Sequence, residues 1–575
     1  MKIFRLIPVL FCLVFGLFVM PIANANPIPI MPIDEVQIGM HGIGKTVISG
    51  TKIEDFDVEV LGVSPSAFGR GNAILVKVTG DVIERAGGVA KGMSGSPVFV
   101  DGKLIGAVAY MQMKTDPHYI YLTAIEDMLS IIEEPMPRPS EYLNLGTDFM
   151  ASGLTPRSVE YLKDKFKKAN DFDLNIVSAP TLKDELKDKL KQVKIEPGSS
   201  CSVMVASGDV TLGAIGTITW TDDEGRYLAF GHTFNNKGAV DYFLGNAWIY
   251  KSVKNLDAAY KIGVPGLIVG NVEQDRATGV AGKIGAHANF IPLFIATTDA
   301  DRGINESINE RIVTDESMVP SLTAALDYNT ANKAIDRVGG GTARVDFHIL
   351  ASGDKSGKIS IDRENMFYDS EDIANKVTEE VAGVLDVLMH NKFEKFTIFD
   401  VKINNEITKH PDIAEIESVQ IRKDATFKAG ETISLKVNLK PYRANQISKI
   451  VNFTIPKDAK PGKLNLIVRG GGDFEWLRSI ISEKIAEGKR FKVEKASIES
   501  FVDAVNNSDQ NNELIVDILP DAATDEYKNG IAAAQEEKAD PADIRKMLRG
   551  TDAKMCYPVS YLVNGETEIV INVKK

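Results

Sequence analysis

Hydrophobic and polar residues alternate with the two-residue period of β-strands over two long stretches of the chain. The clearest hairpin runs from Val98 to Tyr110, where two β-rich runs flank Asp101-Gly102, a pair typical of type I′ turns. Alternation resumes after Pro197-Gly198 and continues to about residue 300. These patterns predict two β-rich segments, at 26–135 and 197–300.

The segment between them, 136–196, has the period of amphipathic helices. Thr155 can cap a helix that begins at Pro156, and a second helix is expected over 182–190. The apolar face of the first helix carries Val159, Leu162 and Phe166. We therefore expect a helical connector between the two β-rich segments.

The C-terminal half mixes both patterns. Residues 301–395 predict a mixed α/β segment with a helix capped by Ser370, whose apolar residues form one stripe. Between 396 and 472, short β-rich runs recur at regular spacing, which is typical of a small β-sandwich. The last segment, 473–575, is mixed, with a helix expected near Phe474 to Ile485.

Residues 1–25 have the layout of a secretory signal peptide. Lys2 and Arg5 precede an apolar run from Leu6 to Ile22, and Ala23-Asn24-Ala25 places small residues before a cut at Asn26. The alternative is an uncleaved anchor helix, because 17 apolar residues lie near the lower limit for crossing a bilayer. We expect export across the cytoplasmic membrane, to the periplasm, cell envelope or exterior, and membrane contact only if this segment stays attached.

Composition excludes several classes of protein. The hydrophobic share of 44% and charged share of 25% are ordinary globular values. A net charge of −13 argues against a nucleic-acid partner, because phosphate binding needs a basic face. After cleavage Cys201 and Cys556 remain, and they could pair in an oxidising compartment. No H-E-x-x-H or C-x-x-C motif supports a zinc site, and we expect no metal or cofactor.

One motif is interpreted as structural. Residues Gly39 to Thr46 match the phosphate-loop pattern G-x-x-x-x-G-K-S/T, which requires a strand before it and a helix after it. Here β-branched residues follow from Val47 to Thr51, and an exported chain meets little ATP. The segment is therefore expected to be a glycine-rich entry to a hairpin and not a nucleotide site.

The segment Gly92-Met93-Ser94-Gly95-Ser96-Pro97 suits a serine nucleophile. Glycines allow a tight turn that exposes a hydroxyl and directs backbone N–H groups at an oxyanion. Ser94 is the candidate nucleophile, and the N–H groups of Gly92 and Ser94 are the candidate oxyanion hole. Ser96 is the alternative nucleophile, but Pro97 favours an extended backbone there, so its hydroxyl is expected to brace the turn. The structural alternative is an ordinary Gly/Ser turn.

A serine nucleophile needs a base within hydrogen-bond reach. His232 follows a predicted strand in Gly231-His232-Thr233 and is the natural partner. His41, His118 and His287 also lie in glycine-rich or turn-rich segments, so composition alone does not decide the choice.

Two separated segments together resemble the sporulation factor IV B type serine peptidases. The nucleophile segment comprises Gly87-Gly88, Gly92 to Pro97, Gly102 and Gly106-Ala107-Val108. The histidine segment comprises Gly216-Thr217-Ile218-Thr219, Asp222 and Ala229 to His232, followed by the similar run Gly270 to Arg276. The resemblance covers roughly residues 30–135 and 195–300.

This resemblance implies a chymotrypsin-like double β-barrel, a Ser-His-Asp mechanism, export, and cleavage of protein substrates in signalling. It makes Ser94 the nucleophile and His232 the base, with the two halves in swapped order because the serine segment comes first. The family's acid aligns with Thr79. Asp81, two residues on, is the assigned acid, with Asp241 or Asp275 as alternatives, or no acid at all.

The sequence thus predicts a mainly β chain, with a permuted chymotrypsin-like double β-barrel, helical connectors and a C-terminal β-sandwich-like domain. The predicted function is an exported serine endopeptidase that cleaves protein or peptide substrates in signalling or envelope processing. Its catalytic residues would be Ser94, His232 and Asp81. The alternative is a non-catalytic envelope binding or scaffold protein that retains the peptidase fold, and the acid is the feature that separates the two.

Overall fold

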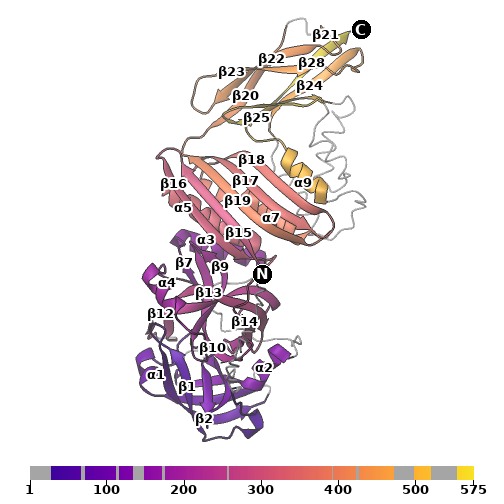
Figure 1. Ribbon diagram of the computed structural model, residues 1–575. Helices are drawn as coiled ribbons and strands as arrows, with labels where there is room; N and C mark the ends of the chain where they lie inside the picture. The colour runs from indigo at the N-terminus through magenta and orange to yellow at the C-terminus, as the bar shows by residue number, and fades with distance from the viewer. Residues whose placement is uncertain are drawn as a thin grey trace, which may run out of the picture.

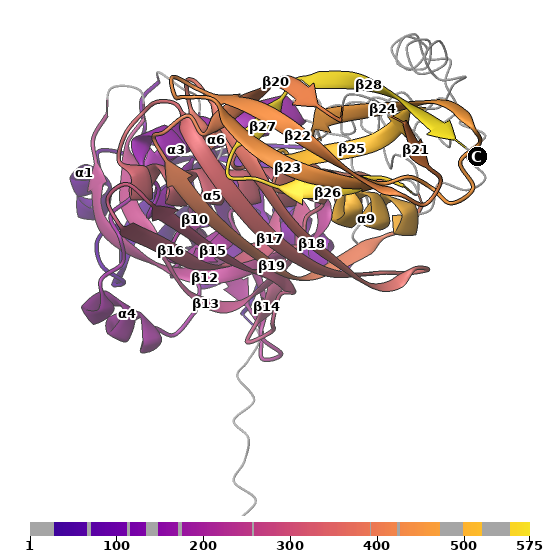
Figure 2. The ribbon, with the colours of Figure 1, turned by 90° about the horizontal axis from the view of Figure 1, so that it is seen from above.

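Three regions follow one another along the molecule: a pair of β-barrels, a sheet covered by helices, and a β-sandwich (Figure 1). Seen from above, the strands of the sandwich overlie the central sheet (Figure 2). The computed structural model describes residues 28–65, 71–111, 115–133, 148–170, 175–255, 258–391, 393–422, 426–471, 498–519 and 553–574. The predicted signal peptide and the helix expected near 474–485 lie outside these residues. Within the described ranges, no helix is both long and apolar enough to cross a bilayer.

The first barrel has six strands, which close in the order β1-β2-β3-β6-β5-β4. Its strands are β1 (His41–Val47), β2 (Ile53–Ser64), β3 (Ala73–Thr79), β4 (Pro97–Val100), β5 (Lys103–Met111) and β6 (Tyr119–Ala124). The helical elements are η1 (Ile33–Glu35), α1 (Asp81–Ala86) and α2 (Ile125–Glu133). Asp101 and Gly102 have φ of 50° and 74°, as a type I′ turn requires, so the predicted β4–β5 hairpin is confirmed.

The glycine-rich segment Gly39 to Thr46 leads into this barrel. Lys45 and Thr46 lie in β1, which pairs antiparallel with β2 and β4. The next element after β1 is the strand β2, where a phosphate loop would need a helix. The interpretation of this motif as a hairpin entry is therefore confirmed.

The connector consists of two helices and two short strands. These are β7 (Phe149–Ser152), α3 (Pro156–Asn170), β8 (Ile176–Ser178) and α4 (Asp184–Lys191). The Ser158 N–H donates to Thr155 Oγ1 at 3.2 Å, so Thr155 caps α3 as expected. Because β7 pairs with β10 and β8 pairs with β7, this segment also extends the sheet of the second barrel.

The second barrel also has six strands, ordered β9-β12-β13-β14-β11-β10 and closed by pairing between β9 and β10. They are β9 (Ser200–Gly208), β10 (Thr211–Thr221), β11 (Arg226–Ala229), β12 (Gly238–Val253), β13 (Tyr260–Arg276) and β14 (Gly279–Ile284). Two closed six-stranded barrels side by side are the arrangement expected for a chymotrypsin-like fold. The mainly β, double-barrel prediction is confirmed.

The central sheet continues from β9 in the order β16-β15-β19-β17-β18. Its strands are β15 (Phe290–Asp299), β16 (Ile304–Val313), β17 (Gly341–Gly353), β18 (Gly357–Asp369) and β19 (Phe396–Thr408). The helices α5 (Val319–Ile335), α6 (Ile373–Lys376) and α7 (Glu379–His390) pack on it, and α5 is almost wholly buried.

Two predictions for this region were wrong. The strand at 396–408 does not open the sandwich, because β19 pairs with β15 and β17 and buries Val401 and Ile403 in the core shared with the helices. Ser370 does not cap a helix. The N-cap of α6 is Asp372, with no side-chain cap, and Asp369 Oδ1 holds the turn before it by accepting the N–H groups of Glu371 and Asp372, both at 2.7 Å.

The C-terminal sandwich contains a four-stranded and a five-stranded sheet around its own core. Its strands are β20 (Ile413–Gln420), β21 (Thr426–Lys428), β22 (Thr432–Pro441), β23 (Ile447–Thr454), β24 (Gly462–Gly470), β25 (Glu513–Leu519), β26 (Met555–Pro558), β27 (Leu562–Asn564) and β28 (Glu566–Lys574). The helix α9 (Ile498–Asn507) packs instead on β18 and adds Val505 to the core of the central sheet. Strands from both sides of the expected boundary at 472 form these sheets, so the described strands between 413 and 574 make one unit. Cys556 in β26 and Cys201 in β9 are both free, so the proposed pairing does not occur.

Candidate active site between the two barrels

The candidate nucleophile lies on a tight turn just before β4. The Met93 N–H donates to Ala90 O and the Ser96 N–H to Met93 O, both at 2.9 Å. Gly92 and Gly95 have φ of 91°, which a residue with a side chain rarely adopts. Among the described residues, the N–H groups of Gly92 and Ser94 have no acceptor. Two backbone donors two residues apart are therefore available to a ligand.

The second barrel holds this turn through β10. The Thr217 N–H donates to Ser94 O at 2.8 Å, and Thr219 Oγ1 donates to Gly95 O at 2.7 Å. A Cβ at Gly95 would lie only 2.0 Å from Thr217 O, so the two backbones approach closely because residue 95 has no side chain.

A second turn presents the candidate base. Phe230 and Gly231 have φ of 70° and 68°, and the Phe230 ring occupies the space that a side chain at Gly216 would need. Thr123 Oγ1, from the first barrel, donates to Gly231 O at 2.6 Å. The left-handed Phe230 is unusual for a bulky residue, and such geometry is often found at functional sites. The turn places His232, 7% exposed, at the contact between the barrels.

A cavity of about 70 Å³ lies between the two turns. It is lined by Gly92, Ser94, Tyr110, Ile215, His232 and Lys261, among others. Ser94 and His232 are separated by 232 − 94 = 138 positions, yet they face one cavity. Within the described chain no hydrogen bond joins the Ser94 hydroxyl to His232, which is common in ligand-free active sites.

The hydrogen bonding of His232 defines its tautomer. Its Nδ1 lies 2.8 Å from Thr233 O. Because a carbonyl oxygen can only accept, Nδ1 carries a proton, and in the neutral ring the lone pair is then on Nε2. This is the form that can accept a proton from a serine hydroxyl. A backbone carbonyl thus holds the tautomer that a carboxylate holds in a Ser-His-Asp triad.

The structure does not place Asp81 beside His232, so its assignment as the catalytic acid was wrong. Asp81 begins α1, which follows directly from the end of β3, and this geometry points its side chain outward. The side chain is 81% exposed and accepts from Arg85 Nε at 2.6 Å. The alternative Asp241 bonds instead to the Asn289 backbone N–H and side-chain amide, at 3.0 and 2.7 Å.

Asp275, the other alternative, acts on the histidine turn indirectly. Its buried carboxylate accepts from Thr233 Oγ1 and the Phe234 N–H, both at 2.7 Å, and from the Asn235 N–H at 2.6 Å. Burial raises the pKa of Asp275, and these donors oppose the rise. The carboxylate therefore fixes the loop that follows His232 while the ring nitrogen bonds to the Thr233 carbonyl.

Three charged residues of the cavity were not found from the sequence. Lys91 and Asp148 form an ion pair of 3.0 Å at its wall. Lys261 is 1% exposed, and its Nζ donates to Thr46 Oγ1 at 3.3 Å. Burial lowers the pKa of Lys261 to about 7. The one available signal was that Lys261 is the single charged residue in the apolar run from Ala258 to Gly266.

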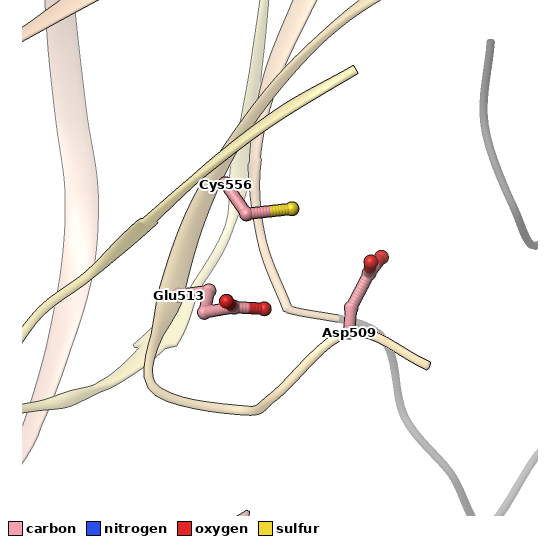
Figure 3. A group of neighbouring side chains, drawn as sticks. All are labelled: Asp509, Glu513 and Cys556. Carbon is pink, nitrogen blue, oxygen red and sulfur yellow. The ribbon is translucent and has the colours of Figure 1, made fainter. Parts of the chain in front are cut away.

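A group of side chains in the sandwich has the composition of a metal site. Asp509, Glu513 and Cys556 lie close together there (Figure 3). However, Arg469 and Lys554 already bond the two carboxylate oxygens of Asp509, at 2.6 and 2.8 Å. Because these cations compensate its charge, we assign no metal to this group.

The comparison with known proteins concerns the barrel that carries Ser94. Residues 14–129 match the family SpoIVB peptidase S55. The resemblance inferred from the nucleophile segment is confirmed, and it supports a serine peptidase, which implies a protein or peptide substrate. The match ends before the second barrel and does not reach His232. No curated protein and no solved structure gives a match.

Proposed function

We propose that the chain is an exported serine endopeptidase that cleaves protein or peptide substrates, in signalling or in processing of the cell envelope. One observation carries the proposal. Ser94 and His232, which lie far apart in the sequence and on different barrels, line one cavity together with two free backbone donors. The apolar, cleavable layout of residues 1–25 supports export.

In the proposed mechanism the Ser94 hydroxyl attacks the scissile carbonyl carbon and His232 Nε2 accepts its proton. The carbonyl oxygen becomes negatively charged and binds the N–H groups of Gly92 and Ser94. The imidazolium then donates its proton to the leaving amine, and water hydrolyses the acyl-enzyme by the same steps. The serine-bearing barrel precedes the histidine-bearing one along the chain, which agrees with the swapped order that the motifs suggest.

The carbonyl partner of His232 Nδ1, where a triad has a carboxylate, is the observation that favours the alternative. In a triad the acid stabilises the imidazolium as well as the tautomer. Here the Nδ1 partner is a carbonyl, which orients the ring without neutralising its charge. A non-catalytic envelope binding or scaffold protein would keep both barrels and have an unreactive serine.

Fluorophosphonate labelling separates the two functions. The purified chain, without residues 1–25, is treated with a small alkyl fluorophosphonate, chosen because the cavity is only about 70 Å³. We expect an adduct on the peptide that contains Ser94, no adduct there in Ser94→Ala, and labelling slower by roughly 10²–10⁴ in His232→Gln. A folded parent protein that forms no adduct, or equal labelling of Ser94→Ala, would support the scaffold function instead.

A further inference from the structure

Lys261 is a charged group of the cavity that the mechanism above does not use. It projects from β13, is almost completely buried, and lines the same cavity as Ser94. Thr46 Oγ1 is its side-chain hydrogen-bond partner, and in the described part of the chain no carboxylate pairs with it. A buried ammonium without a counter-charge is unfavourable. A negative charge that forms nearby would relieve that cost.

The contacts of Lys261 connect it to the candidate oxyanion hole. A Cβ built on Gly92 would lie 3.1 Å from Cδ and 3.3 Å from Cβ of Lys261, so the lysine stem packs directly against Gly92. The Lys261 N–H donates to Lys91 O at 3.0 Å, and the Lys91 N–H donates to Ala259 O at 2.8 Å. Backbone and side chain of β13 therefore hold the segment whose next N–H is an oxyanion donor.

We propose that Lys261 is a positioning residue of the oxyanion hole: its stem holds Gly92 in place, and its ammonium stabilises the negative charge that develops on the scissile carbonyl oxygen. This inference rests on the proposed peptidase function. The charge appears when Ser94 adds to the carbonyl and disappears when the intermediate collapses, so Lys261 transfers no proton and forms no bond. A fixed positive charge in a site that excludes water stabilises an oxyanion more than it would in water.

The ionisation of Lys261 gives the proposal a pH signature. Its pKa is lowered to about 7, so the ammonium is lost as the pH rises through neutrality. The titratable groups that line the cavity with it are Tyr110 from β5, His232, and the Lys91–Asp148 ion pair. The thiol of Cys201 from β9 interacts electrostatically with Lys261, and burial raises the pKa of this thiol to about 12. The thiol stays neutral and the ion pair compensates itself. Activity should therefore fall as the pH rises through neutrality and Lys261 loses its proton.

Three variants isolate the charge from the packing. Lys261→Met keeps an unbranched stem against Gly92 and removes the ammonium. We expect it to lower kcat by about tenfold to a hundredfold at pH 6–7 with little change in KM, and to abolish the alkaline fall. Lys261→Arg, which stays charged, should keep most of the activity without that fall. Thr46→Val removes the acceptor of Lys261 Nζ. It should move the alkaline fall in kcat to lower pH and leave the maximal kcat unchanged.

Two outcomes of these kinetic measurements would contradict the proposal. An unchanged kcat and pH profile in Lys261→Met would remove Lys261 from the site's chemistry. The proposal would also fail if the activity of the parent rose through pH 7 without falling again and both Lys261→Met and Lys261→Arg were inactive. In that case the neutral amine of Lys261 would act as a base.

A second readout does not depend on turnover. Lysine labelled with ¹³C at Cε is titrated by NMR in the parent protein, and the Lys261 signal is identified by its loss in Lys261→Met. We expect a midpoint near pH 7 that rises by about one unit or more when a fluorophosphonate adduct on Ser94 places its phosphoryl oxygen in the oxyanion hole. If no adduct forms, the peptidase function fails and this inference falls with it. If the adduct forms and the Lys261 midpoint does not move, the inference fails while the peptidase function stands.

Discussion

Ser94 and Ser96 lie in one turn but have different surroundings. Ser94 lines the cavity, whereas Ser96 is fully buried and its hydroxyl has no hydrogen-bond partner in the described structure. The expectation that the Ser96 hydroxyl braces the turn was therefore wrong. The backbone of Ser96 braces it instead, because its N–H donates to Met93 O and its carbonyl accepts from Val108.

Ser96→Ala should consequently leave labelling of Ser94 intact and make the protein slightly more stable. An unsatisfied buried hydroxyl costs about 1–3 kcal/mol, and its removal leaves only a small void. We expect the free energy of unfolding in urea to rise by up to about 1 kcal/mol. A loss of more than about 1 kcal/mol would show that the hydroxyl has a bonding partner after all.

The residues of the site differed in how far the sequence could identify them. Ser94 and His232 were found because each lies on a turn whose glycines are close in sequence and form a recognisable motif. The supporting charges, Lys261 and Asp275, lie on β13 and reach the site through the pairing of strands. The acid was misplaced because a family spacing carries over only if the loop has the same path, and here that path ends in the exposed start of α1.

At the scale of elements, the turn before β4 joins the barrels through the backbone of Gly95. Gly95→Ala should abolish labelling of Ser94 and lower the free energy of unfolding by about 3 kcal/mol or more, because the new Cβ meets Thr217 O and the Phe230 backbone. Gly102→Ala is the matched control. Gly102 also has positive φ but has no atom near its Cβ position, so it should cost about 1–2 kcal/mol and keep labelling.

A second joint, the pairing of β16 with β9, connects the central sheet to the second barrel over three residue pairs. Glu310 is one of the paired residues. Its carboxyl group is 4% exposed, accepts the Val210 N–H through Oε1, and leaves Oε2 unsatisfied beside Gly208. Burial raises the pKa of Glu310 from 4.5 to about 8. The folded protein thus keeps this proton at neutral pH, while the unfolded chain releases it.

The raised pKa makes the second joint weaker as the pH increases. Between about pH 4.5 and 8 the unfolded state binds fewer protons, so stability falls with pH, by at most about 4–5 kcal/mol in total. Glu310→Gln keeps an acceptor for Val210 and should lose this dependence. The free energy of unfolding in urea should be measured at pH 5 and pH 8. Relative to the parent, the variant should be more stable at pH 8 than it is at pH 5. Glu306→Gln, at a half-buried position on the same strand, is the control. The difference between its free energy of unfolding and that of the parent should be the same at both pH values.

Elements with local signals were predicted well and those defined by long-range pairing were not. The β4–β5 hairpin and α3 depend on a turn pair and a cap a few residues long. By contrast, β19 has the same alternating pattern as the sandwich strands, and only its parallel pairing with β15 assigns it to the central sheet. Similarly, only pairing with β20 and β24 places β25, β27 and β28 in the sandwich.

For the whole molecule, Arg363 ties the central sheet to the sandwich. It extends from β18, and its Nε donates to Glu380 of α7 at 3.0 Å, with both side chains 2% exposed. Its other nitrogens donate to the carbonyl oxygens of Ser508 and Asp509, at 2.6 and 3.0 Å, in the loop before β25. One buried guanidinium therefore satisfies groups from a strand, a helix and the next region of the chain.

Arg363→Met should lower the free energy of unfolding by about 3–5 kcal/mol, because it leaves the Glu380 carboxylate buried without its cation and two carbonyls without their donor. Since the sandwich has its own core, we also expect calorimetry to separate its transition from that of the remainder. Arg344→Met, on the exposed face of the neighbouring β17, should change stability by less than about 0.5 kcal/mol. The double variant Arg363→Met with Glu380→Met should recover much of the loss, because it removes both charges. If the single variant melts in one unchanged transition, the coupling between the two regions does not pass through Arg363.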